Sequence, residues 1–187
     1  MPEPVTALLA LWNDVDPALD AQYNAWHADE HVPERCTVPG IVWGRRYRLA
    51  AVGDMPHYLT LYGLADAQVL DSEPYQRLLR EPTPASRRMR PALRNVWRWV
   101  CDLRHCDPLD AAGLLWVKSF PDGAAPRVPA TPGGWLLAER SAAASPLPWL
   151  SAGQSSAVEG QWLLCWAPDP ALRAAPPEGT AAYARLR

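Results

Sequence analysis

Five consecutive residues gather several reactive groups in one short stretch: residues 27–31 read His-Ala-Asp-Glu-His. Histidines four positions apart lie on one face of a helix, and Glu30 completes an H-x-x-E-H pattern in which the histidines bind zinc and the glutamate polarises water. A zinc protease also needs a third protein ligand and a larger scaffold, and so short a pattern often arises by chance. We therefore assign no metal, although the same ligands allow a simpler metal site on His27 and His31.

Without a metal, His31 is the candidate catalytic residue. A histidine at the C-terminal end of a helix can act as a general acid or base, and Glu30 beside it could fix its tautomer. The structural alternative is that a protonated His31 interacts with the helix dipole, with Glu30 or Glu34 paired to an arginine nearby in the chain. The sequence leaves both interpretations open.

A second group of candidate residues lies on two strand-like segments, residues 41–49 (IVWGRRYRL) and 57–64 (HYLTLYGL). Alternation puts the leucines of the second segment on one face, which we expect to pack against helices. We expect the opposite faces of both segments to line a cavity, where an arginine favours an anionic or carbonyl-bearing ligand. The alternative is that the aromatic rings only pack the sheet interface. The predicted substrate-binding residues are Trp43, Arg45, Tyr47, Tyr58 and Tyr62.

The elements that carry these residues alternate between strand and helix patterns. An apolar run at residues 6–13 predicts a buried strand, and Asp16-Pro17 predicts the start of a helix with Leu19, Tyr23 and Trp26 on its buried face. Two strands, a second helix at residues 66–80, a Pro-rich loop and a strand at residues 92–103 follow. This order, β-α-β-β-α-β, predicts a ferredoxin-like unit.

The second half of the chain looks like a degenerate copy of the first. LLWVKSFPDG from Leu114 resembles LLALWNDVDP from Leu8, and QWLLCWAPDP from Gln161 resembles HYLTLYGLAD from His57. The spacing leaves too little chain for full crossover helices. We therefore predict an α+β fold of tandem ferredoxin-like repeats, residues 1–106 and a degenerate 107–187, whose antiparallel sheets stack into an α/β barrel around a cavity.

The segment WHADEHVPERCTVPGIVWGRRYRL, residues 26–49, resembles the dimeric α/β-barrel superfamily, and within it the EthD-like branch of mostly uncharacterised proteins. The resemblance extends over HYLTLYGL and LDSEPYQRLLREPTPASRRMRPALRNVWR and covers about residues 5–104. The resemblance implies a ferredoxin-like fold, paired sheets around a pocket and small organic ligands. Relatives in the wider superfamily include cofactor-free monooxygenases, polyketide cyclases, decarboxylases and haem enzymes. Haem ligation by His31, His57 or His105 is therefore an alternative, but the spacing gives no support for it, and we predict no cofactor.

Composition excludes several other classes. The 187 residues are 49% hydrophobic with a formal net charge of -2, which favours neither nucleic acid nor an anionic membrane as partner. No apolar run approaches a bilayer span, and scattered cysteines without a C-x-x-C pair fit the cytoplasm. Nucleotide-binding and acyl-transfer motifs are missing.

Two functions remain, both with a small-molecule ligand. The first is a cofactor-free enzyme of monooxygenase, cyclase or decarboxylase type, acting on a small aromatic or carbonyl compound. The second is a non-catalytic accessory or ligand-binding protein of catabolic or secondary metabolism. The sequence also allows a homodimer.

Overall fold

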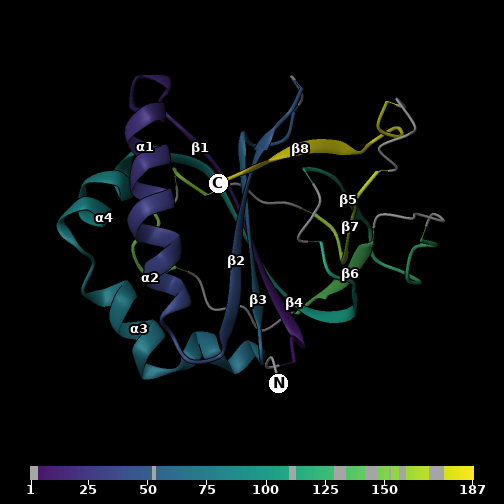
Figure 1. Ribbon diagram of the computed structural model, residues 1–187, viewed down its shortest axis with the longest axis horizontal. Helices are drawn as coiled ribbons and strands as arrows, with labels where there is room; N and C mark the ends of the chain where they lie inside the picture. Colours follow the sequence, from purple (N-terminus) through teal and green to yellow (C-terminus); the bar gives the residue numbers. More distant parts are fainter. Residues whose placement is uncertain are drawn as a thin grey trace.

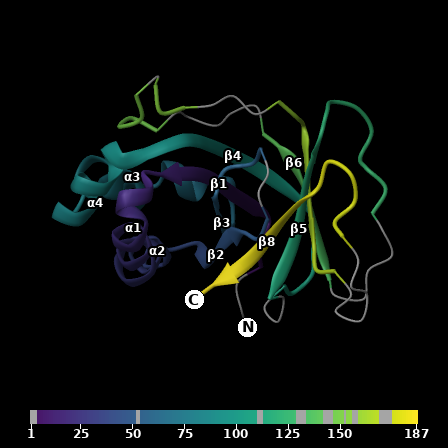
Figure 2. The ribbon, with the colours of Figure 1, turned by 90° about the horizontal axis from the view of Figure 1, so that it is seen from above.

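Eight antiparallel strands form a closed barrel, with helices covering one side of it (Figures 1 and 2). This computed structural model describes residues 4–51, 54–109, 113–128, 134–141, 147–151, 153–155, 159–168 and 175–187. The strands are β1 (Ala7–Val15), β2 (Ile41–Leu49), β3 (Tyr58–Leu64), β4 (Leu93–Cys106), β5 (Leu114–Phe120), β6 (Trp135–Arg140), β7 (Trp162–Trp166) and β8 (Ala181–Leu186). The helices are α1 (Asp20–Trp26), α2 (Val32–Cys36), α3 (Glu73–Arg80) and α4 (Pro84–Met89), with a π-helix η2 (His27–His31) and the 3-10 turns η1 (Pro17–Leu19), η3 (Ala67–Asp71) and η4 (Arg90–Ala92).

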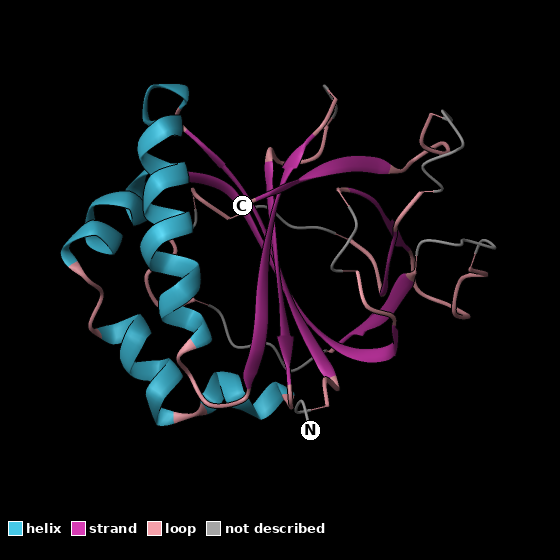
Figure 3. Ribbon diagram, viewed as in Figure 1, coloured by secondary structure: helices cyan, strands magenta, loops and turns pink. Residues whose placement is uncertain are grey.

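The barrel closes within one chain. Its strand order is β1-β3-β2-β8-β5-β7-β6-β4, so β2 pairs with β8 and β4 pairs with β6. The first four strands run in the order β4-β1-β3-β2 and the last four in the order β8-β5-β7-β6, which is the same order when each set is counted along the chain. Among the described residues after β4, no helix connects the strands (Figure 3). The α+β barrel is therefore confirmed at this level.

One long helical segment carries the residues 27–31. It begins at Asp16, whose carboxylate accepts a hydrogen bond from the Ala18 N–H (2.9 Å), and runs through α1, η2 and α2 to Cys36. In its middle, the Val32 N–H donates to the His27 carbonyl, five residues earlier. Pro33 follows immediately, and a proline inside a helix lacks an N–H and clashes with the carbonyl four residues before it. The wider π turn accommodates the proline and lets the helix continue.

The sequence prediction was incomplete at the second helix. Residues 66–80 form the 3-10 turn η3 and then α3, and the segment expected to be a Pro-rich loop contains α4. Thr83 caps α4 by accepting a hydrogen bond from the Ser86 N–H (3.0 Å), and Pro84 occupies the first turn. Proline is well tolerated there because its missing N–H has no partner in a helix start.

Of the two strands with the predicted binding residues, β2 turns Trp43 and Tyr47 into the barrel as expected, whereas β3 turns its tyrosines toward the helices. Directly paired residues lie on the same side of a sheet, and the register pairs Tyr47 with Leu59. Both belong to the core inside the barrel. Tyr58 and Tyr62 belong to the cores beneath the helices. The prediction that Tyr58 and Tyr62 share a cavity face with Trp43, Arg45 and Tyr47 is therefore wrong, because the leucines of β3 fill the barrel.

The close contact between Trp43 and Gly63 gives a test of this packing. A Cβ built on Gly63 would lie 2.3 Å from the Trp43 ring, so a side chain there must displace the indole from the barrel. We expect Gly63→Ala to lower the free energy of unfolding by about 1–3 kcal/mol, as overpacked cores do, in urea denaturation.

Gly113→Ala is the matched control, because a Cβ at Gly113 meets nothing within 4 Å. Equal stability of the Gly63→Ala and Gly113→Ala variants would contradict the placement of Trp43 inside the barrel.

Candidate functional site

A cavity lies between the helices and the helix-facing side of the first-half sheet. Its volume is about 50 Å³. The sheet contributes Leu11, Asn13 and Thr60, and the long helical segment contributes Trp26, both histidines of η2 and Arg35. The remaining wall combines aromatic and aliphatic side chains with one arginine and includes Tyr23, Tyr75, Arg90 and Trp149.

The second half of the chain helps to close this cavity. Leu147 and Trp149 follow β6 in the chain but line the cavity beside α3 and η4. Gln154 fastens the neighbouring segment, since its side-chain amide donates to the backbone oxygens of Arg90 (2.9 Å) and Leu93 (3.0 Å). The cavity is therefore built from both halves of the chain.

The π-helix aligns the two histidines in a stack of rings. The centroids of His27 and His31 are 5.1 Å apart with an interplanar angle of 27°. Tyr23 lies 5.0 Å from His27 on one side, and Trp26 lies 4.5 Å from His31. Both imidazoles are thereby held against aromatic rings in the cavity wall.

A hydrogen bond from the barrel fixes the state of His27. Arg46 Nε donates to His27 Nδ1 at 2.9 Å, so the proton of the neutral imidazole is on Nε2. Burial, together with the positive charges of Arg46 and Arg35, lowers the pKa of His27 to about 3. His27 is therefore neutral at physiological pH, with Nε2 as a hydrogen-bond donor.

Arg46 is itself held by a polar network. Its guanidinium donates to Asn24 Oδ1 (2.8 Å) and to the backbone oxygen of Arg187 (2.9 Å). The Asn24 amide donates to the Tyr58 hydroxyl (2.6 Å), which in turn donates to Asp20. Tyr58 was predicted to touch substrate, but the structure places it in this network behind His27.

His31 lines the cavity as a neutral base. Its Nδ1 is buried without a hydrogen-bond partner. Burial, followed by the neighbouring His27, Arg35 and Arg90, lowers the pKa of His31 well below its ordinary value. The unpaired Nδ1 is therefore available for a hydrogen bond with a ligand, and it accepts a proton in the tautomer that carries the ring proton on Nε2.

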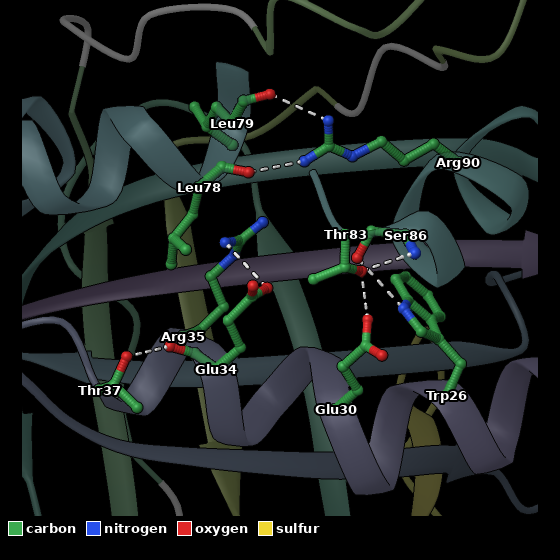
Figure 4. Close-up of polar contacts among 10 residues, drawn as sticks. All are labelled: Trp26, Glu30, Glu34, Arg35, Thr37, Leu78, Leu79, Thr83, Ser86 and Arg90. Atoms are coloured by element: carbon green, nitrogen blue, oxygen red, sulfur yellow. Dashed lines mark hydrogen bonds and ion pairs between the residues drawn. The ribbon is translucent and has the colours of Figure 1, made fainter. Parts of the chain in front are cut away.

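Glu30 does not assist His31. Its carboxylate accepts a hydrogen bond from the Thr83 hydroxyl, and Thr83 is the cap of α4 (Figure 4). Trp26 reaches the same helix, since its indole N–H donates to Ser86 Oγ at 3.2 Å. These contacts fasten α4 onto the π-helix, so the expected role of Glu30 in fixing the histidine tautomer is wrong.

Nor do these residues form the zinc arrangement that H-x-x-E-H would require. His27 Nδ1 is engaged by Arg46, and Glu30 is engaged by Thr83. Among the described residues, no group of three histidine, cysteine or acidic side chains is placed to hold a metal ion.

Two buried arginines complete the wall of the cavity. Arg90 donates to the backbone oxygens of Leu79 and Leu78, both at 3.0 Å (Figure 4). Its guanidinium lies 5.2 Å from the Trp149 ring. Arg35 lies 5.7 Å from the Tyr75 ring and 3.6 Å from the Glu34 carboxylate. Neither arginine was singled out as a binding residue from the sequence.

The other predicted binding residues lie outside this cavity. Tyr47 belongs to the barrel core, the partly buried Trp43 packs against that core, and the Arg45 guanidinium stacks over the Trp43 ring at 4.0 Å. Tyr62 packs beneath the helices, where its buried hydroxyl has no hydrogen-bond partner and burial raises its pKa. Of the predicted site residues, only His31 lines the cavity.

Comparison with known proteins supports the fold. The sequence matches no protein-family model and no curated protein. One similar solved structure is titled "Crystal structure study of anthrone oxidase-like protein", with a TM-score of 0.55 and 10% sequence identity over 98% of this chain and 92% of that chain. At this identity the match shows a shared barrel-like fold. The described part of the chain contains no helix that is long and apolar enough to cross a membrane.

The burial of His27 makes the fold less stable in acid. Because its pKa is lowered from 6.5 to about 3, the unfolded chain binds a proton below pH 6.5 that the folded chain does not bind. The free energy of unfolding therefore falls as pH falls through this range, by about 1.4 kcal/mol per pH unit for one histidine. We expect His27→Gln to remove about that much of the slope between pH 6.5 and 5, measured by urea denaturation.

His105→Gln serves as the control, because the side chain of His105 is 39% exposed. An unchanged slope in His27→Gln would show that His27 is not held neutral in the folded protein.

Proposed function

We propose that the chain is a small-molecule-binding α/β-barrel protein and a cofactor-free enzyme acting on a small aromatic or carbonyl compound. The observation that carries the proposal is the pair of neutral histidines in the aromatic cavity, with His31 Nδ1 unpartnered and His27 Nδ1 engaged by Arg46. One imidazole is free to accept a proton, and the other carries a proton to donate. Trp26 and Tyr75 supply flat apolar surface for a ring.

The reaction step that this pair favours is removal of a proton from an activated C–H or O–H group. His31 Nδ1 takes the proton, and the electron pair of the broken bond stays on the substrate as an enolate or phenolate. The His27 Nε2–H donates a hydrogen bond to that oxygen, which stabilises its negative charge. Enolates and phenolates of this kind are the reactive species that oxygenation or cyclisation without a cofactor requires.

The fold supports the same family of functions. We propose that residues 1–106 and 107–187 are two ferredoxin-like repeats, because both sets of four strands have the same order. The EthD-like resemblance of residues 26–49 and the match to an anthrone oxidase-like protein agree with an enzyme for small aromatic compounds. Cys36, Cys101, Cys106 and Cys165 are free thiols, which fits a cytoplasmic location.

The edges of β2 and β4 are already paired with other strands of the same chain, so a homodimer would use other surfaces.

A non-catalytic ligand-binding protein is the second candidate, and the low pKa of His31 favours it. A base whose conjugate acid has so low a pKa is weak, and general-base catalysis is most efficient when the pKa is near the working pH. On this alternative, the two histidines serve only to hydrogen-bond the ligand.

Turnover by His31→Ala separates the two functions. We expect wild-type protein to convert at least one compound in a screen of phenols and β-dicarbonyl compounds, followed by absorbance and oxygen consumption. His31→Ala should lose about 10²–10⁴-fold in rate, as expected for loss of a general base, while ligand affinity changes far less.

His57→Ala is the control, because His57 lies outside the cavity, where its Nε2 accepts from Arg48 Nε (3.0 Å). Binding without turnover by the wild-type protein would favour the ligand-binding alternative, and a fully active His31→Ala variant would contradict the role of His31.

A further inference from the structure

Arg35 and Arg90 place an excess of positive charge inside the cavity. Their residues are only 5% and 6% exposed. The described residues that line the cavity include both arginines and no carboxylate, and the histidines beside them are held neutral by burial, which lowers the pKa of each. Arg35 Nη1 forms an ion pair with the Glu34 carboxylate at 3.6 Å, which is too long for a hydrogen bond, and Glu34 does not line the cavity. Buried charge that is not fully paired is costly, so the arrangement favours an anion.

Both guanidinium groups keep a donor without a hydrogen-bond partner. Arg35 Nη1 and Arg90 Nε are buried and have no hydrogen-bond acceptor. The two bonds from Arg90 to the backbone of Leu78 and Leu79 fix its plane, and the Tyr75 and Trp149 rings lie against the two guanidinium groups. The donors are therefore positioned before any ligand arrives, which lowers the entropy cost of binding.

We propose that the cavity binds the carboxylate of an anionic small molecule, held by Arg35 and Arg90 beside His31. This inference rests on the proposed function, because it assigns a charge to the ligand of the same cavity. Guanidinium groups suit a carboxylate because their planar N–H donors match its two oxygens. A volume of about 50 Å³ takes roughly three or four water-sized groups, which corresponds to a carboxylate with one or two carbons. A larger ligand requires movement of side chains such as Trp149.

The Coulombic influence of the two arginines on their surroundings supports this assignment. Burial lowers the pKa of Arg90 to about 10, and the positive charge of Arg35 is the next largest cause. Both arginines also lower the pKa of His31. Arg35, Arg90 and His31 therefore share one electrostatic environment, in which one negative group would relieve the repulsion between two cations.

Matched pairs of probes test the charge of the ligand. Acetate and acetamide have nearly the same size and differ in charge, and benzoate and benzamide extend the comparison to a ring. Binding is measured by calorimetry at pH 7 and constant ionic strength. We expect the wild-type protein to prefer the carboxylate of each pair about tenfold or more, since hydrogen bonds to charged groups are stronger than neutral ones.

Substitutions at Arg35 assign the preference to the cavity. Arg35→Met, which keeps the volume and removes the charge, should abolish the preference, and Arg35→Lys should retain part of it. Arg80→Met is the control, because Arg80 is an exposed arginine of α3 paired with Glu73. Circular dichroism and thermal unfolding establish that each variant is folded.

The possible results separate this inference from the proposed function. Equal binding of carboxylate and amide, or a preference that persists in folded Arg35→Met, overturns the inference and leaves a small-molecule site in place. If none of the four probes binds the wild-type protein, the inference falls, and the screen of neutral phenols and β-dicarbonyl compounds then decides the proposed function by itself. Should Arg35→Met fail to fold, the wild-type preference and its reduction in Arg35→Lys decide the inference.

Discussion

The hydrogen bond from Arg46 to His27 joins the barrel to the helix that carries the candidate site. Arg46 projects from β2, where it is 7% exposed, and it is always charged, so it can only donate to an imidazole nitrogen that carries no proton. This one contact therefore sets the position and tautomer of His27, and it acts with burial, the larger cause, to keep the imidazole neutral. The π turn also helps to position His27, because it places His27 and His31 in one stack while the helix continues past Pro33. Asn24 and the backbone of Arg187 hold Arg46 in turn, so the long helix, β2 and the end of β8 meet at a single guanidinium.

The closed barrel explains why the site lies beneath the helices. Leucine, tyrosine and tryptophan side chains from both halves fill the interior, and Trp12, Tyr47, Trp99 and Tyr183 are among its most buried side chains. The helix-facing side of the sheet carries polar side chains such as Asn13 and Thr60, and Asn13 finds a partner on the helices, because its side-chain oxygen accepts a hydrogen bond from the Tyr23 hydroxyl (3.1 Å). The cavity lies on this face of the sheet, where the helices cover it.

Local patterns in the sequence were sufficient to predict where strands form, but they were insufficient to predict which face of a strand points toward the helices. Alternation correctly grouped Tyr58 with Tyr62 and Leu59 with Leu61, but a period of two cannot say which group faces the helices. The expected strand at residues 41–49 and those in the second half are present, because apolar β-branched and aromatic runs between turns form strands in most contexts. The branch of the family and the two-repeat organisation remain predictions.

The candidate site was harder to predict because it depends on distant residues. His31 and His27 were visible in one motif, but the partner that fixes His27 lies on β2, and the motif itself suggested Glu30. Arg90 and Trp149 meet only because the segment near residue 149 returns to the helices after β6. Neither residue belongs to a local sequence pattern that predicts a cavity. α4 was missed because the two prolines around Thr83 indicate a loop unless the cap is considered.

Charge balance links the two proposals into one physical account. Burial is the main cause of the low pKa of His31, and the positive charges of Arg35 and Arg90 also oppose its protonation, so the base is weak. A carboxylate bound to the two arginines would neutralise part of the positive charge and raise the pKa of His31 towards the range where a general base is effective. By linkage, protonation of His31 would strengthen binding of the same carboxylate. An anionic ligand would thus supply the missing charge of the site and activate its base, while His27, held by Arg46 on the barrel side, would remain neutral and continue to donate.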